Sequence, residues 1–116
     1  MNVKIIGPIA VVNSETPLIT DAQSALDLIA SAGFEHNVAK IAINKAAISE
    51  DFFKLSTGLA GEVVQKFVNY NCRLAIIGDF SGYASKPLHD YMYECNNGKH
   101  LNFVADEAEA VRKLRG

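Results

Sequence analysis

The sequence predicts an α/β fold in which helices pack on one open, mixed sheet of four or five strands. Three observations predict this class: two β-prone runs lie close together near the start, short apolar runs alternate with amphipathic segments from residue 38 onward, and 49% of the 116 residues are hydrophobic. A chain of this length can bury enough surface to fold without disulfide bonds. We therefore expect a single domain over residues 1–116.

The first predicted element is a pair of β-prone runs at residues 3–6 and 9–12, separated by Gly7-Pro8. This dipeptide either makes a tight hairpin or kinks one long strand. We expect an antiparallel pair of strands at one edge of the sheet.

The first helix is predicted to begin at residue 20. Residues 20–23, Thr-Asp-Ala-Gln, have the spacing of a capping box with Thr20 as the cap. Ala22, Ala25 and Ile29 continue the pattern of one buried helical face. Gly33 follows this pattern, and we expect it to end the helix in the left-handed conformation.

Two short apolar runs, at residues 38–44 and 73–78, predict interior strands that helices cover on both faces. Between them, Ser49 is expected to cap a brief turn that carries Phe52 and Phe53. Apolar residues at spacings of four, four and three then predict a helix over residues 58–71. A strand, a helix and a strand in this order form a right-handed crossover, so the second strand should be central and parallel to the first.

The last third of the chain predicts two more helices and one more strand. Ser85 and Pro87 mark the start of a helix that Asn97-Gly98 ends. Residues 100–104 predict a strand, and the capping-box spacing at residues 106–109 predicts the final helix. The buried stripe expected for the first of these helices is Leu88, Met92 and Cys95.

The charges are nearly balanced, with 11 basic against 13 acidic residues and a net charge of −2. This balance offers no basic patch for nucleic acid or an anionic membrane. The apolar runs fall short of the roughly 20 residues that a membrane span needs, and no leader or lipid-attachment signal opens the chain. We expect a soluble cytoplasmic protein whose two cysteines, Cys72 and Cys95, are reduced and mostly buried.

The most distinctive stretch is the hydroxyl-rich turn Ser56-Thr57-Gly58, at the start of the helix before the 73–78 strand. Unpaired N–H groups at a helix start let hydroxyls there cap the helix, hold an anion or accept a phosphate. Capping, worth about 1 kcal/mol, explains both hydroxyls without chemistry, and phosphorylation or anion binding is the alternative. Gly58 and Gly61 cost up to about 1 kcal/mol each in a helix, for which we expect close packing on a neighbour rather than a ligand at the backbone.

A second candidate site lies where the parallel strands of the predicted sheet end, because ligands bind at that edge in such folds. The polar residues expected there are Asn44, Lys45, Asp79, Ser81, Tyr83, Lys86 and Asp106. Asp79 is either a general base or, as its place after a glycine favours, part of a turn that its own side chain closes. Lys45 and Lys86 either bind an anion across the edge or are only solvated.

No complete catalytic constellation is present, so we expect no catalytic residue, no metal and no cofactor. His36, His89 and His100 are scattered singly, which supports neither a metal site nor a Ser-His pair. The tyrosines at positions 83, 91 and 93 surround one loop and helix, where packing at the edge or a dimer contact is more usual than catalysis.

From residue 53 to residue 114, the order of turn, helix, strand, helix, strand and helix resembles the STAS domain of anti-sigma-factor antagonists and the bacterial proteins like them. Residues 56–59, Ser-Thr-Gly-Leu, match the turn that carries the phosphorylated serine in that family. Leu55 stands where the family has an aspartate, and Ala60 where it has a second glycine. The resemblance implies a regulatory role with Ser56 as the modified residue.

A closer resemblance covers nearly the whole chain. Several short sequence segments resemble, in the same order, the bacterial family catalogued as domain of unknown function 4180. They lie at residues 57–62, 65–67, 69–70, 74–80 and 85–86. This resemblance implies a fold and a bacterial origin. It implies no activity, because none is established for the family.

Two functions from different classes are left open. The first is a non-catalytic regulatory module that presents the Ser56 turn and its helix to a protein partner, where a phosphate would add up to two negative charges. The second is a small-ligand binder or modest enzyme that uses Lys45, Asp79, Ser81 and Tyr83 at the sheet edge. A homodimer is compatible with either.

Overall fold

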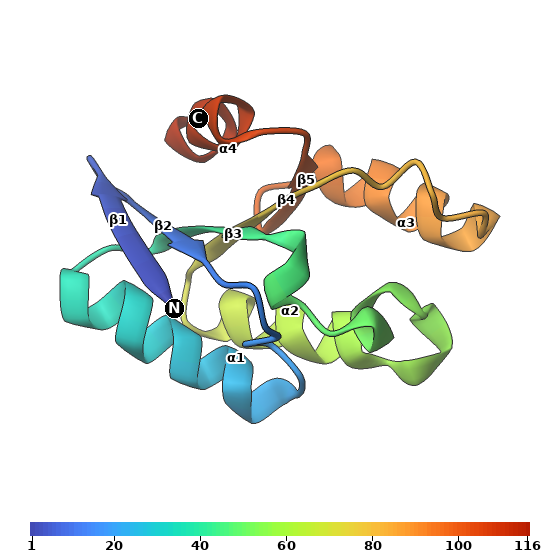
Figure 1. The fold of residues 1–116 in the computed structure, drawn as a ribbon, viewed down its shortest axis with the longest axis horizontal. Helices are drawn as coiled ribbons and strands as arrows, with labels where there is room; N and C mark the ends of the chain where they lie inside the picture. Colours follow the sequence, from blue (N-terminus) through green and yellow to red (C-terminus); the bar gives the residue numbers. More distant parts are fainter.

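The computed structural model describes residues 1–116, which form one five-stranded sheet with helices on both faces (Figure 1). The strands lie side by side in the order β1 (Asn2–Ile6), β2 (Ile9–Asn13), β3 (Lys40–Asn44), β4 (Arg73–Ile77) and β5 (Leu101–Val104). β1 pairs antiparallel with β2, whereas β2, β3, β4 and β5 are parallel. The predicted mixed α/β sheet is confirmed.

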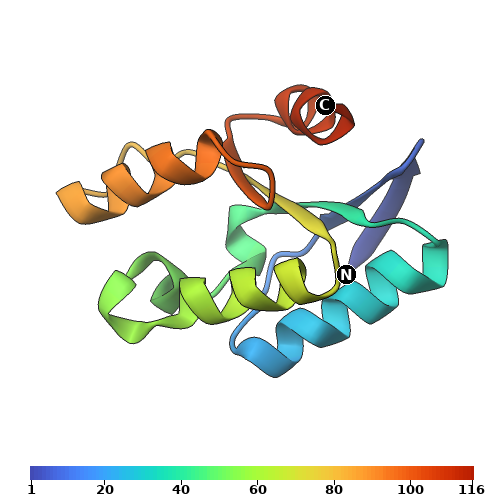
Figure 2. The same cartoon turned by 180° about the vertical axis from the view of Figure 1, so that it is seen from behind.

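Four helices cover the sheet: α1 (Ala22–Leu28), α2 (Leu59–Asn69), α3 (Lys86–Asn96) and α4 (Glu107–Arg115). Short helical turns join them to the strands: η1 (Ile29–Gly33), η2 (Phe34–His36), η3 (Lys45–Ala47), η4 (Glu50–Phe53) and η5 (Leu55–Thr57). Figure 2 shows α1 and α2 on one side of the sheet and α4 on the other. No helix has both the length and the apolar character that crossing a membrane requires.

The core has two parts because alternate side chains along a strand point to opposite faces. Ile41 and Ile43 of β3 belong to the larger buried cluster, which includes residues of α1, α2 and α3. Right-handed crossovers between strands in sequential order place these three helices on one face. Ala42 and Ala75 belong to the smaller cluster with Leu114 of α4, and their small side chains leave room for that helix.

Gly7-Pro8 makes the tight hairpin between β1 and β2. Ile6 pairs with Ile9 directly across the turn. Gly7 has φ 56°, which glycine adopts without strain at the first central position of a two-residue hairpin loop. The predicted antiparallel pair is confirmed, with β1 at the edge of the sheet.

Both predicted ends of the first helix are wrong in detail. The cap is Asp21 rather than Thr20: the Asp21 carboxylate accepts from the Ser24 N–H at 2.7 Å, and Ser24 Oγ accepts from the Asp21 N–H at 3.0 Å. Gly33 lies in a right-handed turn with φ −93°, and the left-handed residue is Asn37 with φ 56°. Asparagine tolerates that conformation, so no glycine is needed where the helical segment ends.

The connection from β3 to α2 consists of η3, η4 and η5 and ends at Gly58, with φ 77°. Ser49 caps η4 as predicted, because its hydroxyl accepts from the Asp51 N–H at 3.2 Å. The Thr57 hydroxyl accepts from the Leu59 N–H at 3.2 Å and so supports the start of α2. The strands on either side of this crossover are parallel, as the spacing predicted.

The last two helices begin as predicted. Ser85 Oγ accepts from the Leu88 N–H at 3.3 Å at the start of α3, and the Asp106 carboxylate accepts from the Glu109 N–H at 2.8 Å at the start of α4. Leu88 is buried, but Cys95 is only half-buried, so the predicted buried stripe of α3 is incomplete.

Neither glycine at the start of α2 packs closely on a neighbour, and the prediction of close packing is wrong. A Cβ built on Gly58 or on Gly61 would meet no atom within 4 Å. Gly58 is explained by its positive φ, which strains other residues. Gly61 is exposed, and neither its backbone nor its surroundings require a glycine.

Alanine substitutions at these two glycines should have opposite effects. Gly58→Ala should lower the free energy of unfolding by about 1 kcal/mol, because a side chain is strained at positive φ. Gly61→Ala should raise it by about 0.5 kcal/mol, because alanine favours the helix and its Cβ meets open space. Urea unfolding measures both changes, and a destabilised Gly61→Ala variant would contradict the open surroundings of Gly61.

Candidate functional site

The carboxyl ends of β3 and β4 bring Lys45 and Gly78 side by side. Asn44 is in register with Ile77, so the residues after them leave the sheet at the same edge. A Cβ built on Gly78 would lie 2.7 Å from Lys45 Cβ and 3.0 Å from Lys45 Cδ, which is closer than such atoms approach. Gly78 therefore leaves the space that the Lys45 side chain occupies.

Glu50 joins this edge to the loop that follows β4. The Tyr83 hydroxyl donates to the Glu50 carboxylate, at 2.9 Å from Oε2 and 3.1 Å from Oε1. Lys45 Nζ lies 3.5 Å from Glu50 Oε1. Lys45, Glu50 and Tyr83 thus form one cluster, which we call the edge cluster.

Aromatic rings support the edge cluster. The Phe53 and Tyr83 rings are stacked, with centroids 5.1 Å apart and planes 20° apart. Lys45 Nζ lies 5.0 Å from the Tyr83 centroid and 5.6 Å from the Phe53 centroid, within cation–π range. Phe53 is only 3% exposed and contacts Phe80 and Phe103, so the core holds one side of the cluster in place.

The surroundings keep Lys45 charged and Tyr83 protonated. Tyr83 and then Glu50 raise the pKa of Lys45, although partial burial opposes them. Burial is the main cause that raises the pKa of Tyr83. At neutral pH the cluster therefore offers an ammonium group and a hydroxyl donor.

Asp79 closes the turn after β4 with its own side chain, as the sequence favoured. Its Oδ1 accepts from the Ser81 N–H at 3.0 Å and from the Ser81 hydroxyl at 2.7 Å. These bonds, with a smaller effect of Lys45, lower the pKa of Asp79. Asp79 therefore stays ionised near Lys45, and its hydrogen bonds to Ser81 serve the turn.

The other predicted edge residues do not join the edge cluster. Lys86 is 84% exposed, and its Nζ pairs with Asp90 Oδ2 at 2.8 Å on α3. The Asn44 side chain accepts from the Ser14 N–H at 2.9 Å and donates to the Ser14 carbonyl at 2.7 Å, so it extends the pairing of β2 with β3. Asp106 is occupied as the cap of α4.

Two hollows lie beside the edge cluster, and Glu50 is the one residue that lines both. The first, which we call the Ser56 hollow, has a volume of about 530 Å³ and is lined by Glu50, Phe53, Leu55, Ser56, Tyr83 and Leu88 among others. The second, the Lys45 hollow, has about 540 Å³ and is lined by Lys45, Ile48, Glu50, Gly78 and Asp79 among others. Both volumes fall in the range of small-molecule sites.

Ser56 and Thr57 have different roles although they are neighbours. Thr57 Oγ1 lies 2.7 Å from the Asp51 carbonyl and 2.9 Å from the Lys54 carbonyl, and it accepts from the Leu59 N–H. The Thr57 hydroxyl is thus committed to the local turn. Ser56 is exposed, its hydroxyl has no hydrogen-bond partner, and it lines the Ser56 hollow.

No histidine or cysteine side chain bonds to the side chains of the edge cluster. No group of three or more His, Cys, Asp or Glu side chains is arranged to hold a metal. His89 Nε2 contacts the Tyr83 carbonyl, which helps to hold the loop before α3. Cys72 is buried and Cys95 is half-buried, and burial raises the pKa of both free thiols.

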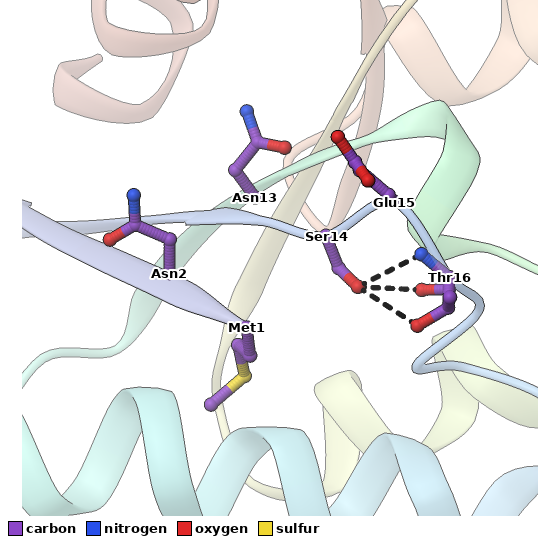
Figure 3. A pocket seen from close by; sticks show the side chains of 6 residues that line it. All are labelled: Met1, Asn2, Asn13, Ser14, Glu15 and Thr16. Atoms are coloured by element: carbon purple, nitrogen blue, oxygen red, sulfur yellow. Dashed lines mark hydrogen bonds between the residues drawn. The ribbon is translucent and has the colours of Figure 1, made fainter.

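A further hollow, of about 450 Å³, lies beside the ends of β1 and β2 (Figure 3). Ser14 Oγ there donates to the Thr16 carbonyl at 2.7 Å and accepts from the Thr16 N–H at 3.2 Å. In Figure 3 the Met1 side chain points away from Asn2 and Asn13. The polar groups of this hollow do not converge on one point, so we do not assign it a ligand.

Sequence reasoning missed Glu50 and Phe53 as members of the site. Both lie in a short turn without periodicity, and Glu50 meets Tyr83, which is 33 positions later in the chain. The one available signal was their place in the connection after a parallel strand, where sheet-edge sites form.

The fold and the edge cluster define a small α/β protein whose polar side chains gather at the carboxyl edge of a largely parallel sheet. The sequence matches the family described as Domain of unknown function (DUF4180) over residues 6–114. The chain therefore belongs to this family, as the sequence resemblance implied. A search of curated proteins finds no match.

Gly78→Ala should displace the Lys45 side chain, because the new Cβ and Lys45 Cβ cannot both keep their places. We expect the free energy of unfolding to fall by about 1–3 kcal/mol, as in other overpacked sites. Gly82→Ala is the matched control, because a Cβ there meets no atom within 4 Å. It should change the free energy by less than about 0.5 kcal/mol. Urea unfolding compares the two variants, and equal stabilities would contradict the contact.

Proposed function

We propose that this protein is a non-catalytic, STAS-like regulatory module that presents the Ser56 turn and the start of α2 to a protein partner. The observation that carries the proposal is the free Ser56 hydroxyl, which is exposed at the wall of a hollow of about 530 Å³. Thr57, its neighbour, already supplies the hydroxyl that the turn needs. The turn therefore does not need the Ser56 hydroxyl for its stability.

The lining of the Ser56 hollow fits a protein segment better than a polar metabolite. Leu55 and Pro87 supply accessible apolar surface beside the buried Phe53 and Leu88, and Lys54 and Glu50 supply charges of both signs. An exposed apolar recess bordered by charges is typical of recognition surfaces. A phosphate on Ser56 would add up to two negative charges to this wall and so alter which partner binds.

The resemblance to anti-sigma-factor antagonists supports the same proposal. Ser56 occupies the position of the phosphorylated serine in the matching turn, and the order from η5 through α2, β4, α3, β5 and α4 is the order on which that resemblance rests. On this proposal the protein acts in the bacterial cytoplasm as one unit over residues 1–116, and phosphorylation or anion binding at Ser56 controls it.

A second candidate function is the binding of a small ligand at the sheet edge. The observation that favours it is the convergence of Lys45 and Tyr83 on one carboxylate between two hollows. Asp79 lines the Lys45 hollow as well, whereas Ser81 contributes only to the turn.

A charge at position 56 should change partner binding without changing stability. In affinity capture with quantitative mass spectrometry, Ser56→Asp should alter the recovery of at least one partner by about tenfold, which corresponds to about 1.4 kcal/mol. Asn37→Asp is the control, because it adds the same charge at an exposed turn before the amino end of β3. Identical partner profiles for the wild type and both variants would refute the regulatory proposal, provided that urea unfolding shows all three to be folded.

A further inference from the structure

Glu50 occupies a position that two donors define. The Tyr83 hydroxyl and the Lys45 ammonium group reach the same carboxylate, at 2.9 Å and 3.5 Å. The Glu50 side chain is 63% exposed, so burial does not hold it there. The Lys45 side chain is only 29% exposed.

The two donors are held in place independently of Glu50. The Lys45 stem lies against Gly78, and its Nζ lies over the Tyr83 and Phe53 rings. Tyr83 stacks on buried Phe53, and its carbonyl contacts His89. The donor pair is therefore preorganised, whereas the exposed acceptor can exchange with another carboxylate at small cost.

We propose that Lys45 and Tyr83 form a receptor for the carboxylate of a small aromatic monocarboxylic acid, and that Glu50 fills this receptor in the free protein. The inference rests on the small-ligand function named above and specifies its ligand class. The ligand carboxylate takes the place of the Glu50 carboxylate, and the Glu50 side chain turns outward into solvent.

The Ser56 hollow would receive the apolar part of the ligand. Phe53, Leu55, Pro87 and Leu88 line it, together with Glu50 and Tyr83 of the edge cluster. Its volume of about 530 Å³ exceeds what one aromatic ring requires. An aromatic ring in this hollow would bury apolar surface while its carboxylate reaches Tyr83 and Lys45.

The surrounding charges select the ligand class. Lys45 repels amines at this position and attracts one negative charge. Asp79 lines the neighbouring Lys45 hollow and remains ionised, and Glu50 stays close after it turns outward. A second carboxylate close to the first would meet both of these charges, so a monocarboxylate is favoured over a ligand with two neighbouring carboxylates.

Isothermal titration with phenylacetate tests this receptor directly. Glu50→Gln should bind phenylacetate about tenfold more tightly than the wild type, because the neutral amide competes less strongly for Lys45 and does not repel the ligand carboxylate. Asp51→Asn is the matched control: it removes the same charge from the next residue, whose side chain is 62% exposed. It should leave the affinity unchanged.

Removal of either donor should weaken binding. In the Glu50→Gln background, Tyr83→Phe and Lys45→Met should each lower the affinity for phenylacetate at least about tenfold, which is the usual loss for a charge-assisted hydrogen bond. Tyr83→Phe keeps the ring that stacks on Phe53, so it tests the hydroxyl alone. Urea unfolding identifies which variants are folded and can be compared.

Three results would overturn the proposal. Glu50→Gln could bind phenylacetate no more tightly than Asp51→Asn, or no folded variant could bind it at millimolar concentrations. Alternatively, benzylamine or phenethyl alcohol could bind as tightly as phenylacetate. This last result would remove the carboxylate receptor but leave the small-ligand function standing, whereas the absence of binding by all three probes would remove both.

Discussion

The pairing of β3 with β4 determines where the polar side chains of this protein meet. Because the two strands are parallel and in register as far as Asn44 and Ile77, Lys45 and Gly78 leave the sheet at the same edge. The absent side chain of Gly78 leaves space for the Lys45 stem, whose charged end then reaches Tyr83 and Glu50. The place of Lys45 in the edge cluster depends on this close approach.

The opposite edge of the sheet is closed by structural hydrogen bonds. The Arg73 guanidinium, at the first residue of β4, donates to the Lys99 carbonyl at 2.7 Å and to the Lys113 carbonyl at 3.0 Å near the end of α4. The helix dipole also stabilises a cation at the carboxyl end of α4. Asn102 is buried, and its Nδ2 lies 3.4 Å from the Gly98 carbonyl beyond α3. The amino edge thus serves stability, and the hollows at the carboxyl edge remain open.

Local sequence patterns predicted the hairpin, the parallel crossover and the caps at Ser49, Ser85 and Asp106, but they were less reliable at single positions. The capping box of the first helix begins one residue later than expected, because Ser24 provides a reciprocal hydroxyl that Gln23 does not. Gln23 instead donates to Asp27. Several residues near a helix start can supply a cap, and small differences in geometry select among them.

The sequence by itself determined the fold class, the strand directions and the edge at which polar residues gather, because hydrophobic periodicity and local hydrogen bonds act over a few residues. Only the tertiary structure decided that Glu50 meets Lys45 and Tyr83, and that Ser56 is free while Thr57 is bonded. These outcomes depend on how the irregular turns after β3 pack against the loop after β4. No periodic pattern in the sequence predicts such packing, since the contacts join side chains that are distant along the chain.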